Sequence, residues 1–289
     1  MSRTAEAVAT TGSHLMFARV NGVRIAYELS GGSGPPLALV HGSWGSHHSW
    51  DPVAQALAEH ACVVTYDRRG HSSSERPQGQ GRFTEDVDDL AALLAHLRMA
   101  PAWIVGNSAG AVITLKLAAA RPEMLRGIIV HEPPLLSLLD ETSADAAAVE
   151  EDGPLAQVRH RLEDGDHAGG AEQFVDEVAL GPGSWARLPT AMRETMVHNA
   201  ATYLDELKDP EWQTIDEAGL ARYEGPVLLT RGDQSPPLFR PILNRLADLL
   251  PQAQRHVYRG AGHIPYATHP DDFAREVLGF VSQGRGRTT

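Results

Sequence analysis

The sequence predicts an α/β fold in which helices cover both faces of a mostly parallel sheet, with one helical insertion. Short apolar runs typical of buried strands alternate with segments whose apolar residues recur at helical spacing. This alternation favours a parallel sheet. The segment from about Pro133 to Tyr223 breaks the alternation, because it is rich in Ala, Glu, Asp and Leu and contains no convincing strand. We therefore expect a core formed by residues 1–132 and 223–289 and a helical cap formed by residues 133–222.

The predicted elements follow one another along the chain in the order that this fold requires. FARVNGVRIAYELSGG is expected to form a hairpin around Asn21-Gly22, a dipeptide typical of tight turns. Helices are expected in DVDDLAALLAHLRM, which has acidic residues in its first turn, in AGAVITLKLAAARPE, which stops before Pro122, and in DDFAREVLGF. Six apolar runs are predicted as buried strands: LALVH (37–41), CVVTYD (62–67), AWIVGN (102–107), GIIVHE (127–132), PVLLTRG (226–232) and the weaker AQRHVYRG.

Composition excludes several classes of protein. The 289 residues are 42% hydrophobic and 21% charged, as in a globular protein of this size. The formal net charge of −12 argues against a general nucleic-acid binder. The one cysteine, Cys62, cannot form an internal disulfide and is expected to be a buried strand residue. The first residues lack the apolar core of a signal peptide, and no uncharged apolar stretch is long enough to span a membrane, so we expect a cytoplasmic protein with no membrane partner.

The pentapeptide GNSAG, residues 106–110, fits the pattern G-x-S-x-G, in which a serine occupies a tight turn between a strand and a helix. The run AWIV precedes it and an Ala-rich helix follows, as the pattern requires. The small residues around Ser108 allow such a turn, which would raise its hydroxyl above the sheet. The backbone N–H of Ala109, at the start of the helix, is a candidate oxyanion donor. The alternative is an ordinary Gly-rich loop with Ser108 as a helix N-cap.

A serine nucleophile needs a base, and His263 is the candidate. It lies in the loop RGAGHIPYATHP, between the last predicted strand and the final helix, on the same edge of the sheet as Ser108. A second oxyanion donor is expected from the backbone N–H of Ser43 in HGSWG, which follows the run LALV. His41 is expected to brace that loop rather than to catalyse. No metal and no cofactor are expected, because the sequence contains no HExxH, CxxC or acidic metal cluster.

These motifs resemble those of the α/β-hydrolase superfamily. HGSWG is similar to its oxyanion loop, GNSAG to its nucleophile elbow and GAGH to its histidine loop, while YDRRGHSSS (66–74) is similar to its YDxRGxGxS turn, with Ser72 in place of the second glycine. The resemblance covers the chain outside the insertion. It implies an eight-stranded, mostly parallel sheet with a cap over the active site. A serine at the elbow argues against the dehalogenase and epoxide hydrolase branches, where an aspartate serves.

The acid that would orient His263 is not at its usual place. In most of the superfamily it follows the strand read here as PVLLTRG, in the pattern Gly-x-x-Asp, but Ser235 stands at that position and Asp233 is the only nearby acid. Glu132 ends the preceding strand, on the same edge of the sheet. The stretch HE-x-P resembles zearalenone lactonases, in which a glutamate after this strand serves as the acid. We expect Glu132 to take that role. Asp233, some other acid or no acid at all are the open alternatives, and Glu132 would then be a strand-end carboxylate that forms a salt bridge to the cap.

The expected activity is hydrolysis of an ester or lactone. Ser108 would attack the carbonyl while His263 takes its proton, and the amides of Ser43 and Ala109 would hold the oxyanion. The same triad cleaves carbon–carbon bonds in β-diketone-type compounds, and a ligand-binding protein on a hydrolase fold is a further alternative.

The expected partner is a bulky, mostly uncharged small molecule, bound in an apolar pocket. For each residue proposed to line this pocket, packing inside the cap is the alternative. A homodimer remains open. The candidates for the pocket are Trp44, Trp185, His198 and Tyr203.

Overall fold

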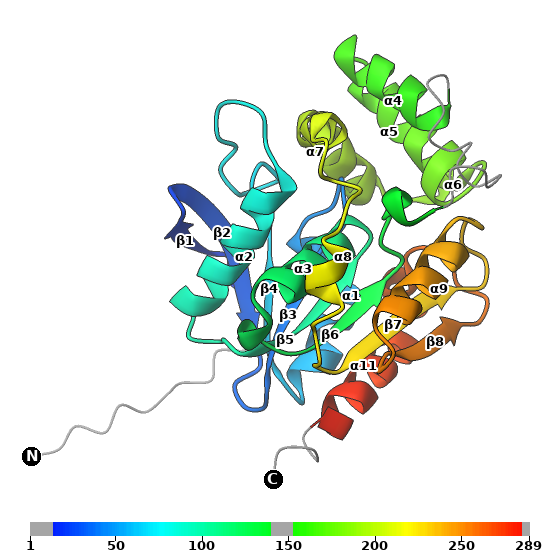
Figure 1. The fold of residues 1–289 in the computed structure, drawn as a ribbon. Coiled ribbons are helices and arrows are strands. Elements are labelled where there is room, and N and C mark those ends of the chain that lie inside the picture. The colour runs from blue at the N-terminus through cyan, green and yellow to red at the C-terminus, as the bar shows by residue number, and fades with distance from the viewer. Residues whose placement is uncertain (1–13, 140–152, 285–289) are drawn as a thin grey trace, which may run out of the picture.

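The computed structural model describes residues 14–139 and 153–284, and in these ranges the chain forms a single eight-stranded sheet (Figure 1). The strand order is β1-β2-β4-β3-β5-β6-β7-β8, with β2 antiparallel to both of its neighbours and the remaining neighbours parallel. The expectation of a mostly parallel, eight-stranded sheet is confirmed. The strands are β1 (Met16–Val20), β2 (Val23–Ser30), β3 (Pro36–Val40), β4 (Cys62–Tyr66), β5 (Ala102–Asn107), β6 (Leu125–His131), β7 (Val227–Gly232) and β8 (Gln254–Tyr258).

The predicted hairpin forms between β1 and β2. Asn21 and Gly22 have φ angles of +48° and +82°, and Val20 pairs with Val23 across the turn. Positive φ at both central residues is the geometry that favours Asn-Gly in two-residue hairpins. The sequence signal and the backbone conformation therefore agree here.

Helices cover the two faces of the sheet because successive strand residues point to opposite sides. In β3, Ala38 and Val40 pack against the first group of helices, whereas Leu37 and Leu39 pack against the second. The first group consists of α2 (Phe83–His96), α3 (Ala109–Ala120), α8 (Glu217–Leu220) and α9 (Phe239–Leu249). The second group consists of α1 (Asp51–Ala58), α10 (Pro265–Thr268) and α11 (Pro270–Gly284).

The segment between β6 and β7, here called the helical insertion, contains helices and no strand within residues 133–139 and 153–222. Figure 1 shows α4 to α7 grouped at the opposite end of the molecule from α11. They share a small apolar core with Trp44, which comes from the loop after β3. The short helix α8 instead packs on α3, so the end of the insertion already belongs to the sheet layer. Its elements are η3 (Leu136–Leu138), α4 (Pro154–Glu163), α5 (His167–Gln173), the π-helical η5 (Phe174–Ala179), α6 (Ser184–Arg187), α7 (Thr190–Lys208) and α8.

The structure bears only in part on two expectations about the compartment, namely that the chain has no membrane-spanning segment and that it has no signal peptide. Among the described residues, no helix combines the length and the apolar character that crossing a membrane requires. Residues 1–13, on which the expectation of a missing signal peptide depends, lie outside the described residues. Cys62 is partly buried at the start of β4, and burial raises the pKa of its thiol.

Candidate active site

Ser108 lies at the tight turn between β5 and α3, with φ of +54° and ψ of −122°. Such a φ is uncommon for a residue with a side chain, so neighbouring contacts must hold it. The Ser108 N–H donates a hydrogen bond of 2.9 Å to the carbonyl oxygen of His131 on β6. The turn has no space for a side chain at Gly106 or Gly110. A Cβ added to Gly106 would lie 2.3 Å from the Gly110 carbonyl oxygen, and a Cβ added to Gly110 would lie 2.1 Å from the Val40 carbonyl oxygen. The turn holds the Ser108 side chain at the carboxyl end of the sheet.

His263 lies in the loop between β8 and α10 and is tied to this turn. Asn107 Nδ2, from the residue next to Ser108, donates a hydrogen bond of 3.0 Å to the carbonyl oxygen of His263. The imidazole stacks on the Phe239 ring, with the ring centroids 4.7 Å apart and the planes 11° apart. The residue is only 7% exposed. Ser108 and His263 line the same cavities, so the structure brings the two predicted residues together.

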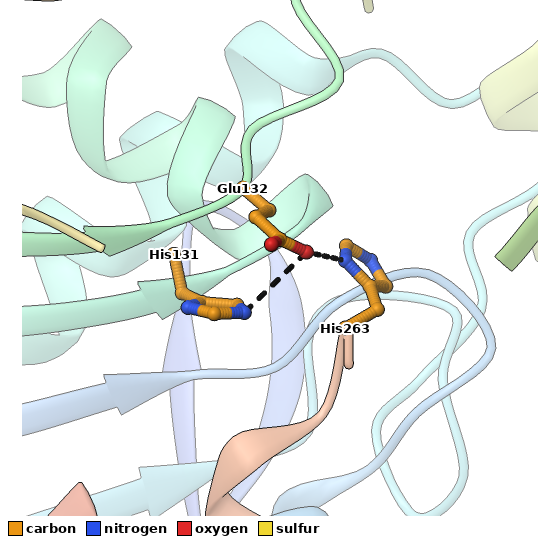
Figure 2. Close-up of side chains that lie close together, drawn as sticks. All are labelled: His131, Glu132 and His263. Atoms are coloured by element: carbon orange, nitrogen blue, oxygen red, sulfur yellow. Dashed lines mark hydrogen bonds and ion pairs between the residues drawn. The ribbon is translucent and has the colours of Figure 1, made fainter. Parts of the chain in front are cut away.

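Glu132 follows the end of β6 and points at His263 (Figure 2). Its Oε2 lies 2.6 Å from His263 Nδ1, and its Oε1 accepts a hydrogen bond of 2.8 Å from the N–H of Gly232. The residue is fully buried. Burial by itself raises the pKa of Glu132, but the neighbouring His131 and His263 outweigh burial and hold the pKa well below its usual range. The side chain is therefore a carboxylate that faces His263.

Asp233, the alternative acid, has another contact. Its Oδ1 accepts a hydrogen bond of 2.7 Å from the N–H of Gly260, which closes the turn after β8 on the exposed surface. Ser235, which stands at the usual position of the acid, lines a cavity. The Ser235 hydroxyl is buried and has no hydrogen-bond partner among the described residues. In the described structure the acid in contact with the His263 ring is Glu132.

Sequence reasoning missed a second histidine beside Glu132. His131 Nε2 lies 3.4 Å from Glu132 Oε2, and His131 Nδ1 lies 2.9 Å from Thr230 Oγ1. Burial lowers the pKa of His131, and the neighbouring Glu132 opposes that effect. Adjacent strand residues normally point to opposite faces, but the φ of +48° at Glu132 breaks the extended backbone there. Figure 2 shows the result, with the Glu132 carboxylate between the two imidazole rings.

Ser43 and Ala109 were predicted to supply backbone donors for an oxyanion. Ala109 is the first residue of α3, so no helical carbonyl accepts its N–H. The loop after β3 passes close to the nucleophile, because a Cβ added to Gly42 would lie 3.0 Å from the Ser108 Cβ. Ser43 comes next in this loop and lines both cavities at Ser108. Both residues therefore lie near Ser108, Ala109 as its neighbour in the chain and Ser43 in the wall of the same cavities.

His41 braces the same loop, as expected. Its Nε2 accepts a hydrogen bond of 3.0 Å from the N–H of Arg68, so its proton is on Nδ1, which donates to the Gly42 oxygen at 2.8 Å. Burial, together with the charge of Arg68, lowers the pKa of His41 to about 3. A neutral ring with both nitrogens engaged has a structural role.

Two cavities meet at Ser108, with volumes of about 510 Å³ and about 680 Å³. Trp44 lines the smaller cavity and Tyr203 lines the larger one, as two of the predicted pocket residues. Both cavities share six lining residues, namely Ser43, Ser108, Phe174, Ala179, Leu180 and His263. The rest of the smaller cavity includes Leu188, Met192, Met196, Ile264 and Tyr266, and the rest of the larger includes Pro134, Leu155, Trp212, Leu238 and Phe239.

The structure does not bring Trp185 and His198 to the nucleophile. Both border a separate shallow hollow on the helical insertion, where the Arg193 guanidinium lies 5.9 Å from the Trp185 ring centroid. His198 precedes Asn199, which is buried against the core. Residues adjacent along a helix point in different directions, so the side chain of His198 faces outward. Sequence spacing alone did not show which sides of α6, which carries Trp185, and of α7, which carries His198, face the cavities.

Three of these residues could be read as a metal site. Ligand atoms of His131, Glu132 and His263 lie within 4.8 Å of one another. However, Glu132 Oε2 and His263 Nδ1 are only 2.6 Å apart, whereas two ligands of one tetrahedral zinc ion are about 3.3 Å apart. The spacing suits a shared proton better than a shared metal ion.

Known proteins resemble this chain in sequence and fold. A family model described as "alpha/beta hydrolase fold" matches residues 35–270. The chain is 46% identical over 123 residues to the uncharacterized hydrolase YraK of Bacillus subtilis (strain 168), and this match covers 42% of the chain but only 45% of YraK.

Two further proteins match over most of their length. Over 254 residues the chain is 27% identical to the pimeloyl-[acyl-carrier protein] methyl ester esterase of Yersinia pseudotuberculosis serotype O:1b (strain IP 31758), covering 86% of the chain and 94% of that esterase. The crystal structure of an alpha/beta hydrolase from Sphaerobacter thermophilus DSM 20745 has a TM-score of 0.74 and 27% identity, covering 92% of this chain and 99% of that one.

Proposed function

Because this chain belongs to the α/β-hydrolase fold family and is a hydrolytic enzyme of that family, we propose that it cleaves a carboxylic ester or lactone through a Ser-His-Glu triad. Ser108 is the nucleophile, His263 the general base and Glu132 the acid. The contact of 2.6 Å between Glu132 Oε2 and His263 Nδ1 carries this proposal. It fixes the proton of neutral His263 on Nδ1 and leaves Nε2 free to accept a proton.

The reaction then follows from the positions of these groups. As Ser108 Oγ attacks the carbonyl carbon, its proton passes to His263 Nε2, and the ionised Glu132 stabilises the imidazolium. The N–H groups of Ser43 and Ala109 bind the oxyanion of the tetrahedral intermediate. When the bond to the alkoxy oxygen breaks, His263 donates its proton to that oxygen. Water attacks the acyl-enzyme by the same steps and restores Ser108.

The cavities support a bulky, mostly apolar small molecule as substrate. Most of the residues that line them beyond the shared site are aliphatic or aromatic, and apolar pockets bind by removing apolar surface from water. In this proposal residues 133–222 act as a cap, except that α8 at their end packs on α3 of the core. The described part of this segment supplies Phe174, Leu180 and Met192 to the cavity walls. The core of the enzyme is then residues 1–132 and 223–289.

The name of one relative favours ester cleavage. The Yersinia protein is a methyl ester esterase by name and aligns with 86% of this chain. A lactone is an internal ester, so the same attack on the carbonyl opens it. The substrate panel therefore includes both open-chain esters and lactones.

The test is a substrate panel combined with active-site labelling. The purified protein should hydrolyse apolar esters or lactones and should be labelled by a fluorophosphonate, which reacts with activated serines. Ser108→Ala should abolish labelling and lower kcat by several orders of magnitude. Ser282→Ala, at an exposed position on α11, is the matched control and should change neither.

Three results would contradict the proposal. Full activity of Ser108→Ala would exclude the serine mechanism. Failure of the wild-type protein to be labelled would favour a ligand-binding protein on a hydrolase fold. Cleavage of β-diketones without cleavage of any ester or lactone would assign the site to carbon–carbon bond hydrolysis instead.

A further inference from the structure

The loop that carries Ser43 is not held by its own backbone. It joins β3 to the 3-10 turn η1 (His47–Trp50), and its only internal backbone hydrogen bond, from Gly45 N–H to the Gly42 oxygen, is long at 3.4 Å. Trp44 has φ of +67°, a conformation that costs free energy for a residue with a side chain. Contacts from outside the loop must therefore hold its shape.

Helix α7 of the helical insertion supplies those contacts to three consecutive loop residues. Glu206 Oε2 accepts a hydrogen bond of 2.5 Å from Ser43 Oγ. The Tyr203 ring packs on the Trp44 ring, with centroids 4.4 Å apart. Asn199 Nδ2 donates to the carbonyl oxygens of Trp44 at 3.1 Å and of Gly45 at 2.8 Å.

The three helix residues form one face of α7. Asn199, Tyr203 and Glu206 are spaced four and then three positions apart, which places their side chains on the same side of a helix. Each of them is at most 5% exposed. Asn199 also accepts the N–H of Ser72 at 2.8 Å, and Ser72 has φ of +45°. One helix face thus holds two strained segments of the core.

Burial of the Glu206 carboxylate costs free energy, which suggests that its hydrogen bond with Ser43 serves a function. Its Oε1 accepts a hydrogen bond of 2.7 Å from Arg68 Nη2, and Arg68 is also paired with Asp86. Burial raises the pKa of Glu206, and Arg68 opposes that rise. Replacing buried ion pairs by apolar residues is often neutral or stabilising. Stability alone is therefore a weak reason for a carboxylate at this place.

The direction of the Ser43 N–H depends on the peptide that joins Gly42 to Ser43. In a trans peptide the C=O and the N–H point in opposite directions, and the Gly42 oxygen is already held by His41 Nδ1 at 2.8 Å. Glu206 holds the other side of this unit through the Ser43 side chain. Together the two contacts restrict rotation of this peptide, and hence the range of directions in which its N–H can point.

We propose that the oxyanion hole is built jointly by the core and α7, with Glu206 as a positioning residue that orients the Ser43 N–H through the Ser43 hydroxyl. This inference rests on the proposed function, because it concerns the oxyanion of that reaction. Its consequence is that the helical insertion does more than bind substrate. The insertion sets transition-state stabilisation, so loss of its contact with Ser43 lowers kcat rather than weakening substrate binding.

The experiment compares Ser43→Ala and Glu206→Gln with wild type. Ser43→Ala removes the hydroxyl but keeps the backbone N–H and the Glu206–Arg68 pair. Glu206→Gln leaves a single acceptor oxygen, whereas the Ser43 hydroxyl and the Arg68 guanidinium each donate to a separate oxygen of Glu206. Removing an oxyanion donor altogether costs about 10²–10³-fold in kcat, so misdirecting one should cost about 10-fold to 10²-fold in kcat, with KM changed less than about 3-fold.

Further measurements separate positioning from general damage. Affinity for a trifluoromethyl ketone, which forms a tetrahedral adduct with serine, should fall in parallel with kcat, whereas affinity for the carboxylic acid product should not. The double variant should be no slower than the worse single variant, since both remove the same contact. Ser43→Thr, which keeps a hydroxyl, should recover most of the activity. Glu194→Gln, the same change at an exposed position of α7, is the control and should match wild type.

The outcomes distinguish this inference from the proposed function. If Ser43→Ala keeps wild-type kcat while Ser108→Ala is inactive, the inference is wrong and the serine mechanism stands. If Ser108→Ala is fully active, the proposed function itself fails. If Glu206→Gln proves unstable on thermal unfolding, Ser43→Ala alone decides, because it leaves the buried charges unchanged.

Discussion

Replacing Glu132 by glutamine tests the most unusual part of the proposed triad. Glu132→Gln keeps the size of the side chain and one oxygen but removes the charge that faces His263 Nδ1. The buried amide would also present an N–H₂ group where Nδ1 now donates. Asp233→Asn is the matched change at the alternative acid, whose carboxylate contacts the Gly260 N–H.

The expected magnitude follows from the charge that His263 gains in the transition state. Two unit charges about 4 Å apart interact by about 4 kcal/mol at an effective dielectric constant of about 20. Since each 1.36 kcal/mol changes a rate by about tenfold, loss of this interaction should lower kcat about 10³-fold. A preference for the wrong tautomer of His263 would raise the loss towards about 10⁴-fold.

The assay is hydrolysis of a chromogenic ester, with kcat and KM measured for both variants and for wild type. Glu132→Gln should lose about three orders of magnitude in kcat, whereas Asp233→Asn should stay within about 3-fold of wild type. Thermal unfolding must show that both variants are folded at the assay temperature. If Asp233→Asn abolishes activity while Glu132→Gln retains it, the triad assigned here is wrong.

Three further predictions concern the turn, the buried acid and the cavities. Gly110→Ala should destabilise the protein by about 3 kcal/mol or more and abolish fluorophosphonate labelling, because the added Cβ would lie 2.1 Å from the Val40 oxygen; wild-type stability in urea unfolding would contradict this. Because the pKa of Glu132 is lowered in the folded state from the usual 4.5, its contribution to stability is complete above about pH 4.5 and is lost as the pH falls toward the folded-state pKa. Wild type should therefore lose stability relative to Glu132→Gln below about pH 4, and parallel stability curves between pH 2 and 7 would refute the assignment of a carboxylate. Met192→Trp narrows only the smaller cavity and Leu238→Trp only the larger, so the two variants should lose activity toward different members of an ester series with long acyl or long alkoxy groups; identical selectivity changes would show that the cavities act as one.

The elements and the nucleophile were predictable because their signals are local. The turn at Ser108 needs small residues on both sides, which GNSAG supplies, and the hairpin turn needs positive φ, which Asn21-Gly22 adopts readily. A few residues therefore determine each turn. The position of Glu132 at a strand end also placed it on the correct edge of the sheet. These features depend on short stretches of backbone and on the rule that parallel strands end together.

The remaining features depend on which way a side chain turns, and the sequence carries little information about that. His131 pairs with its neighbour only because φ at Glu132 is positive. Trp185 and His198 are aromatic residues of the insertion like Tyr203, yet only Tyr203 faces a cavity at Ser108. The face of α7 formed by Asn199 and Glu206 meets a loop more than a hundred residues earlier in the chain, a pairing that no local pattern reveals.

The displaced acid has a consequence for how such an enzyme could diversify. In the proposed triad the loop after β7 supplies no catalytic residue. Gln234, Ser235 and Leu238 in this loop nevertheless form part of the wall of the larger cavity. Mutations there can reshape substrate preference while the proton-transfer apparatus on β6 and β8 stays intact. Selection for new substrates is thereby uncoupled from selection for chemistry, and this loop is the place to begin a directed-evolution library.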